Sequence, residues 1–189
     1  MLNDTVVFEQ NDAENFSAFI KAAYKSFETK YPKFFKMDDL SKLSFLAADV
    51  LLKNEQLNTE VENNIAIVLS NKASSLETDR AHQKTIQDEE NYFPSPAIFV
   101  YTLPNICIGE ISIKHKLYSE NSFFIFDNFN GQLLLDYANS LITDKKADKV
   151  LCGWVDFDTN HYDAFLYLVG TEETSIEHTE ETILKIYNT

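Results

Sequence analysis

The sequence predicts a layered α/β domain with a mostly parallel sheet and a hairpin of strands near its C-terminus. Segments whose apolar residues recur at helical spacing alternate with short continuous apolar runs, as in sheets whose buried strands are joined by helices. Two apolar runs near the C-terminus are separated only by the turn-like DTNHYD, which indicates the hairpin. No repeat, low-complexity tract or linker interrupts the chain, so we expect residues 1–189 to form a single domain.

The helices are predicted from apolar residues spaced three or four apart. They cover residues 12–30, 38–53, 131–144 and 175–187, with a shorter helix around residues 79–87. Asp12 is a plausible N-terminal cap of the first helix, and Pro32 ends or follows it.

The strands are predicted from short apolar runs between polar flanks. They cover residues 65–69, 122–126, 150–157 and 164–169, and the first two have the composition of buried strands. A further apolar stretch covers residues 94–116.

The charge and glycine content exclude several classes of function. Thirty acidic residues against sixteen basic ones give a formal net charge of −14, so we expect no nucleic acid and no anionic membrane as partner. The four glycines form neither GxGxxG nor GxxxxGK[ST], which excludes nucleotide binding through those loops, and no cofactor is expected.

The chain has no apolar run approaching eighteen residues and no basic, apolar N-terminal leader, so we expect a cytoplasmic protein. Its two cysteines, Cys107 and Cys152, have apolar neighbours. We expect both to be small buried side chains without a disulfide.

Three stretches, in order and with matching spacing over about residues 31–157, resemble β-ketoacyl-ACP synthases. They are YPKFFKMDDLSKLSFLAADVLL, NICIGEISIK, and SENSFFIFDNFNG followed by a helix and ADKVLCGWVD. Gly109, Gly131 and Gly153 fall where the pattern of these enzymes has glycine, at positions that need close packing or a tolerant backbone. The resemblance implies the N-terminal, α-β-α half of a thiolase-like fold, in which residues 5–9 replace the opening strand.

The resemblance also implies that the nucleophile is missing. Counting back from Gly131, the catalytic cysteine of ketosynthases falls on Asn128, beside the bulky Phe129. An amide cannot replace the thiolate that accepts an acyl chain, and neither cysteine lies in the right place to do so. Asn128 is similar to the Gln of non-catalytic chain-length factors, or it caps the following helix, and both can hold together.

The supporting residues of a ketosynthase are missing as well. In ketosynthases the histidines and the lysine lie in a C-terminal half, and we expect the residues that follow the ADKVLCGWVD stretch not to replace it. His82, His115, His161 and His178 are expected to be exposed, and no pair has metal-ligand spacing. The acidic clusters 88–90, 156/158 and 172–173 are expected to be solvated faces rather than a carboxylate active site. We therefore expect no catalytic residue and no metal.

Three functions remain open from the sequence. The first is a non-catalytic ketosynthase-like accessory subunit in fatty-acid-like or polyketide- and polyene-like biosynthesis, paired with a full-length ketosynthase or with itself through residues 122–126. The second is a divergent acyl-transfer or hydrolytic enzyme that uses Asp127, Asn128 or Ser122. The third is a homodimer that binds an acyl chain or another small molecule. The net charge disfavours direct docking of an acidic acyl carrier protein, so a carrier is expected to contact this chain only indirectly.

Overall fold

The computed structural model describes residues 1–10, 15–55, 57–58, 60–159, 161–172 and 176–189. A four-stranded sheet lies at the centre, in the order β2-β1-β3-β4. Its strands are β1 (Ile65–Asn71), β2 (Asn121–Ile125), β3 (Lys149–Asp158) and β4 (His161–Gly170). β1 runs parallel to both β2 and β3, and β3 forms an antiparallel hairpin with β4. The predicted mostly parallel sheet with a C-terminal hairpin is confirmed.

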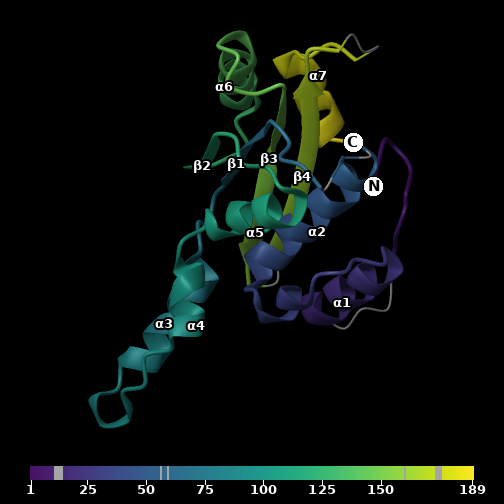
Figure 1. Ribbon diagram of the computed structural model, residues 1–189. Helices are drawn as coiled ribbons and strands as arrows, with labels where there is room; N and C mark the ends of the chain where they lie inside the picture. The colour runs from purple at the N-terminus through teal and green to yellow at the C-terminus, as the bar shows by residue number, and fades with distance from the viewer. Residues whose placement is uncertain (11–14, 56, 59, 160, 173–175) are drawn as a thin grey trace.

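Helices cover both faces of the sheet (Figure 1). Ile65, Ile67 and Leu69 point to a core shared with α1 (Phe16–Ser26), α2 (Asp39–Lys53) and α5 (Ile106–His115). The alternate residues Ala66 and Val68 point to a second core beneath α6 (Gly131–Thr143). Both faces of β1 are therefore buried, which explains its uninterrupted apolar sequence.

A helical hairpin extends away from the sheet (Figure 1). It contains α3 (Leu76–Ile86), α4 (Pro96–Phe99) and two 3₁₀ turns, Glu89–Asn91 and Val100–Thr102. We call residues 76–103 the arm. The apolar stretch at residues 94–116 is thus split between the arm and α5, because Pro104 separates them.

Several predicted boundaries shift. Asp12 lies outside the described residues, and Asn15 caps α1 by accepting a hydrogen bond from the Ala18 amide at 3.0 Å. The last helix, α7, is Glu180–Tyr187, shorter than residues 175–187, and Ser175 lies outside the described part. The strand expected at residues 5–9 is wrong, because only an isolated bridge between Leu2 and Thr5 forms there.

The strand β2 is an edge strand rather than a buried one. Only β1 pairs with it among the described residues, and its side chains are half-buried or exposed. Ile125 at its end is 48% exposed.

Among the described residues, no single helix is long and apolar enough to cross a membrane. The pair Pro96–Thr102 and Ile106–His115 reaches that length and composition only when joined across a bend of 95°.

Candidate functional site at the β2–α6 elbow

The position that the sequence resemblance aligns with the nucleophile of ketosynthases, Asn128, lies in the short connection between β2 and α6. Asp127 and Asn128 are exposed there, three or four residues before α6 begins at Gly131. The Phe126 amide donates to the Asn71 carbonyl at 2.9 Å, so the connection leaves the sheet beside the end of β1. Asn128 is absent from the residues with positive φ, so it is not held in the left-handed region.

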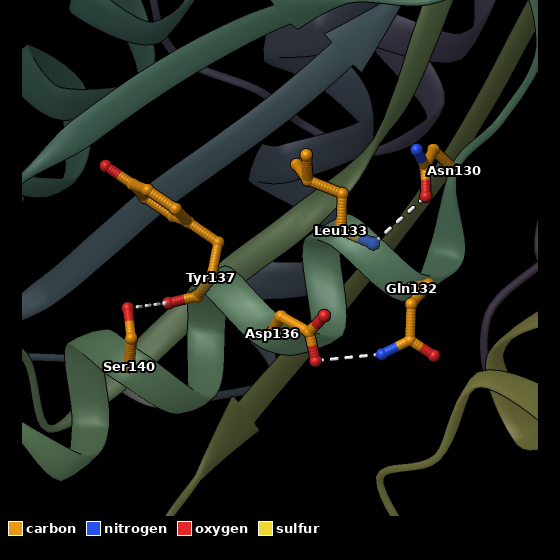
Figure 2. Close-up of a pocket in the computed structure, with 6 residues that line it drawn as sticks. All are labelled: Asn130, Gln132, Leu133, Asp136, Tyr137 and Ser140. Atoms are coloured by element: carbon orange, nitrogen blue, oxygen red, sulfur yellow. Dashed lines mark hydrogen bonds between the residues drawn. The ribbon is translucent and has the colours of Figure 1, made fainter.

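The cap of α6 is Asn130 and not Asn128. The Leu133 amide donates to Asn130 Oδ1 at 3.0 Å (Figure 2). The predicted capping role of Asn128 is therefore wrong by two positions, because a cap must immediately precede the first helical residue.

We expect Asn130→Ala to lower the free energy of unfolding by about 1 kcal/mol, because it removes the acceptor for an N-terminal amide of α6. The exposed Asn128→Ala should change it by less than about 0.5 kcal/mol. Urea unfolding of the two variants makes the comparison. Equal losses would mean that Asn128 also supports the helix.

A cavity of about 380 Å³ lies beside the elbow, where β1 and β2 end. Its lining residues are Lys72, Asp127, Asn128, Phe129, Trp154, Asp156, Asp163, Leu184, Tyr187 and Asn188. They come from the ends of the parallel strands, the β3–β4 hairpin and α7. This is the side of a parallel sheet at which ligands of such folds are usually held.

Aromatic rings close the wall of the cavity behind Asn128. The ring centroid of Phe129 lies 4.5 Å from that of Tyr187, 5.6 Å from Phe165 and 6.2 Å from Trp154. A Cβ atom on Gly131 would lie 3.4 Å from Ile183 Cγ2 of α7. The C-terminal helix therefore packs directly on the elbow.

Two of the three aspartates that line the cavity, Asp156 and Asp163, are hydrogen-bonded to other parts of the protein, and the third, Asp127, is exposed. Asp156 accepts hydrogen bonds from the amides of Lys72 and Ala73 at 3.0 and 2.9 Å. Tyr187 donates to Asp163 Oδ2 at 2.7 Å, and burial together with this contact raises the pKa of Tyr187 to about 12. The geometry thus gives these two aspartates structural partners and no acid–base pair.

The acidic clusters of the arm and after β4 are exposed where the structure describes them, as predicted, whereas Asp156 and Asp158 are half-buried and bonded, so for this pair the prediction is wrong. Asp88, Glu89 and Glu90 are exposed in the arm, and Glu172 is exposed after β4. Glu173 lies outside the described residues. Asp158 forms an ion pair with Arg80, which holds the pKa of the Asp158 carboxyl below its usual value. No group of three metal-ligating side chains forms within the described residues.

Both cysteines are buried free thiols, as predicted. Cys107 lies in α5 and Cys152 in β3. Burial raises the pKa of each thiol to about 12, so both remain protonated near neutral pH and neither is a nucleophile.

Ser122 does not belong to the elbow cavity. It lies near the start of β2, with its hydroxyl 3.0 Å from the hydroxyl of Tyr137 on α6. The outer face of α6 around Tyr137 forms a separate open groove of about 430 Å³ (Figure 2). The three residues of the acyl-transfer hypothesis are therefore divided between two places.

The expectation that all four histidines are exposed is wrong. His115 is buried, and His82 and His178 are half-buried. His178 precedes α7 and lies 3.2 Å from Asn139 Oδ1, and burial lowers its pKa. Only His161, at the start of β4, is exposed.

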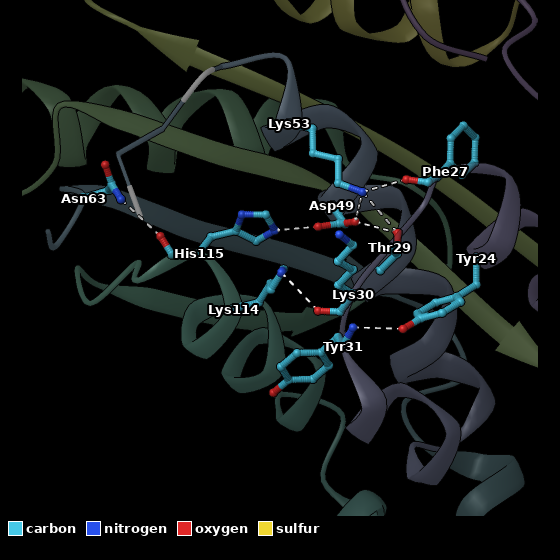
Figure 3. Close-up of polar contacts among 10 residues, drawn as sticks. All are labelled: Tyr24, Phe27, Thr29, Lys30, Tyr31, Asp49, Lys53, Asn63, Lys114 and His115. Atoms are coloured by element: carbon cyan, nitrogen blue, oxygen red, sulfur yellow. Dashed lines mark hydrogen bonds and ion pairs between the residues drawn. The ribbon is translucent and has the colours of Figure 1, made fainter. Parts of the chain in front are cut away.

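His115 is part of a buried charged cluster between α2 and α5 (Figure 3). Its Nε2 lies 3.2 Å from Asp49 Oδ1, while Lys53 Nζ and Thr29 Oγ1 lie 2.8 and 2.7 Å from Asp49 Oδ2. Burial alone would raise the pKa of Asp49, but the contacts with His115, Lys53 and Thr29 outweigh it and lower the pKa. The cluster lies in the α1–α2–α5 layer, and none of its residues lines the elbow cavity.

A second buried carboxylate, Glu110, lies on α5. It accepts hydrogen bonds from Tyr31 at 2.9 Å and Tyr101 at 3.4 Å, and Lys33 Nζ lies 2.6 Å from it. Burial and the nearby carboxylate raise the pKa of both tyrosines to about 12. Glu110 therefore fixes the C-terminal end of the arm, through Tyr101, to the body of the domain.

No protein-family sequence profile and no curated protein matches the chain. Similarity appears instead in solved structures. One is the ishigamide ketosynthase/chain length factor, with 23% identity and a TM-score of 0.56 over 66% of this chain and 36% of that chain. Another is the ketosynthase ApeO in complex with its chain length factor ApeC from Xenorhabdus doucetiae, with 18% identity and a TM-score of 0.62 over 85% and 74% of the respective chains.

A third similar structure is AntDE:AntF, a type II polyketide synthase acyl carrier protein in complex with its ketosynthase bound to the hexaketide. It is 16% identical, with a TM-score of 0.57 over 79% of this chain and 48% of that chain. The chain thus spans between about a third and three quarters of the proteins it resembles. These similarities show that the chain has the thiolase-like fold of ketosynthase and chain-length-factor subunits.

Proposed function

We propose that this protein is a non-catalytic, chain-length-factor-like subunit that pairs with a ketosynthase in polyketide- or polyene-like biosynthesis. The observation that carries the proposal is an asparagine at the β2–α6 elbow of a fold shared with ketosynthase and chain-length-factor structures. The amide of Asn128 cannot form a thioester, and neither buried thiol is available to replace it. In this proposal residues 1–189 form one ketosynthase-like unit.

The edge strand β2 is the proposed contact with the ketosynthase. Its outer side has no strand partner among the described residues, so its backbone groups are available to pair with a strand of another chain. Phe123 and Phe124 are half-buried and Ile125 is exposed, which gives this edge an apolar surface. An accessory subunit of this kind acts by shaping a shared site rather than by chemistry of its own.

The alternatives have less support in the geometry. A divergent acyl-transfer enzyme would use Asp127, Asn128 or Ser122, but Ser122 is bonded to Tyr137 outside the elbow cavity, apart from the other two. An acyl-binding homodimer would need an apolar slot, but many of the aromatic rings pack on one another in the core, as Tyr31 does on Phe45 at 4.8 Å.

The test is a tagged pull-down from native extract, with the bound proteins identified by mass spectrometry. We expect a full-length ketosynthase in near-equal amount. Ile125→Lys should reduce its recovery at least about tenfold, because it places a charge in an apolar edge contact. The matched control is Ile113→Lys, which changes an equally exposed residue on α5.

Two results would count against the proposal. Recovery of the chain alone would favour a homodimer, whose solution mass Ile125→Lys should then reduce. A ketosynthase recovered equally well by Ile125→Lys and the wild-type chain would place the contact elsewhere than β2.

A further inference from the structure

The arm presents a concentration of exposed hydrophobic side chains. Phe93 is 73% exposed, Phe99 60%, Leu103 58% and Tyr92 57%, and Val100 is also exposed. Large aromatic side chains are costly to leave in water, and clusters of them on a protein surface mark sites of interaction. None of these residues lines the elbow cavity or belongs to β2.

The arm is an ordered structure rather than a loose loop. The Phe93 amide donates to the Thr85 carbonyl at 2.9 Å, and the ring of Phe99 lies 5.2 Å from that of His82, which ties its two sides together. At its base, Ser75 Oγ donates to the Thr102 carbonyl at 2.5 Å. The backbone that carries these aromatic side chains is thus ordered before any partner binds, which lowers the entropic cost of binding.

The negative charge of the arm indicates the charge of the partner surface that would bind it. Residues 76–103 contain five acids and two bases, and the acids Asp88, Glu89 and Glu90 are exposed next to Tyr92 and Phe93. A second copy of this chain would bring a net charge of −14 and the same acidic tip, so like charges would face each other. A surface with lysines and arginines around an apolar depression would instead be attracted.

We propose that the arm is a docking surface for a different protein subunit, one with an apolar depression bordered by basic residues. Phe93 and Tyr92 are the anchors that enter the depression, and Asp88, Glu89 and Glu90 pair with its basic border. The proposal rests on the proposed function in expecting a second subunit, and it adds a surface separate from the β2 edge. In Figure 1 the arm extends to the lower left, away from the sheet and from β2.

Site-specific photo-crosslinking in native cells tests the proposal. The photoreactive amino acid p-benzoylphenylalanine is placed at position 93 in the arm, at position 125 in β2, and at the exposed position 143 on α6 as a control. We expect position 93, and not position 143, to cross-link to a different protein, at a peptide that contains lysine or arginine beside apolar residues.

A paired substitution measures the contribution of the anchors. Tyr92→Ser with Phe93→Ser should lower recovery of that protein at least about tenfold without changing the melting temperature, because both side chains are exposed. Val61→Ser, an exposed hydrophobic residue outside the arm, should leave recovery unchanged.

The outcomes separate the two proposals. A cross-link to a second copy of this chain, to an acidic peptide, or no cross-link at position 93 overturns the docking surface. A ketosynthase cross-linked from position 125 but not from position 93 overturns the arm alone. A basic protein that is not a ketosynthase, cross-linked from position 93, supports the arm and contradicts the proposed function.

Discussion

Gly153→Ala is expected to lower the free energy of unfolding by about 3 kcal/mol, at the upper end of the cost of overpacking a core. A Cβ atom at this position would lie 2.2 Å from the Phe165 carbonyl oxygen and 2.5 Å from Leu166 Cδ2. The first of these is a backbone atom of the paired strand β4, which cannot move without breaking the hairpin. Thermal and urea unfolding would measure the loss.

Gly109→Ala is the matched control. Nothing lies within 4 Å of a Cβ atom built at Gly109, which is on α5. Alanine there should stabilise the protein by about 0.5–1 kcal/mol, because it favours the helix. The two substitutions thus have opposite signs, and a loss at Gly109 as large as at Gly153 would contradict this account of both positions.

Asp49→Asn is expected to lower the free energy of unfolding at pH 7 by about 3 kcal/mol, because it removes the buried carboxylate that pairs with Lys53 and accepts a hydrogen bond from Thr29. Asp39→Asn is the control, since Asp39 pairs with Lys42 on the partly exposed side of the same helix. Its effect should stay below about 1 kcal/mol.

The pH dependence distinguishes the charge of Asp49 from its shape. The pKa of Asp49 in the folded state is lowered from its ordinary value of 3.8. Its charge therefore stabilises the fold fully above pH 3.8, and this contribution is lost as the pH falls through the folded-state pKa. The gap in stability between the wild-type chain and Asp49→Asn should shrink below pH 3.8. A gap that stays constant to pH 2 would mean that packing, not charge, causes the loss.

Local patterns in the sequence predicted the order of the elements well. The alternation of Ile65 to Leu69 with helical segments identified the sheet, and spacing from Gly131 identified the elbow. The composition of SFFIF predicted a buried strand, which was wrong, whereas the pairing edge that the resemblance assigned to residues 122–126 agrees with the position of β2 at the end of the sheet order. The glycines of the motif also differ in how closely they are packed. A Cβ atom at Gly153 would clash with the neighbouring strand β4, whereas nothing lies within 4 Å of a Cβ atom at Gly109.

Contacts between segments far apart in the chain could not be predicted from the sequence. His115 stands between Lys114 and Lys116 in the sequence, but it is buried opposite Asp49, 66 residues earlier. Phe129 was expected to crowd the elbow, yet its packing against Tyr187 depends on how α7 returns to the sheet. The exposure of Phe93 could not be predicted either, because an apolar sequence alone does not distinguish a core residue from one on the arm.

The net charge of the chain also bears on self-association through the open edge of β2. A parallel edge strand with apolar side chains is a template on which further copies of the same chain can add, strand by strand. With a charge of −14 on every copy, mutual repulsion opposes that growth at low ionic strength. At about 1 M salt the screening length falls to roughly 3 Å and this protection disappears. The acidity of the chain thus opposes self-association through the edge that the proposed function reserves for a ketosynthase.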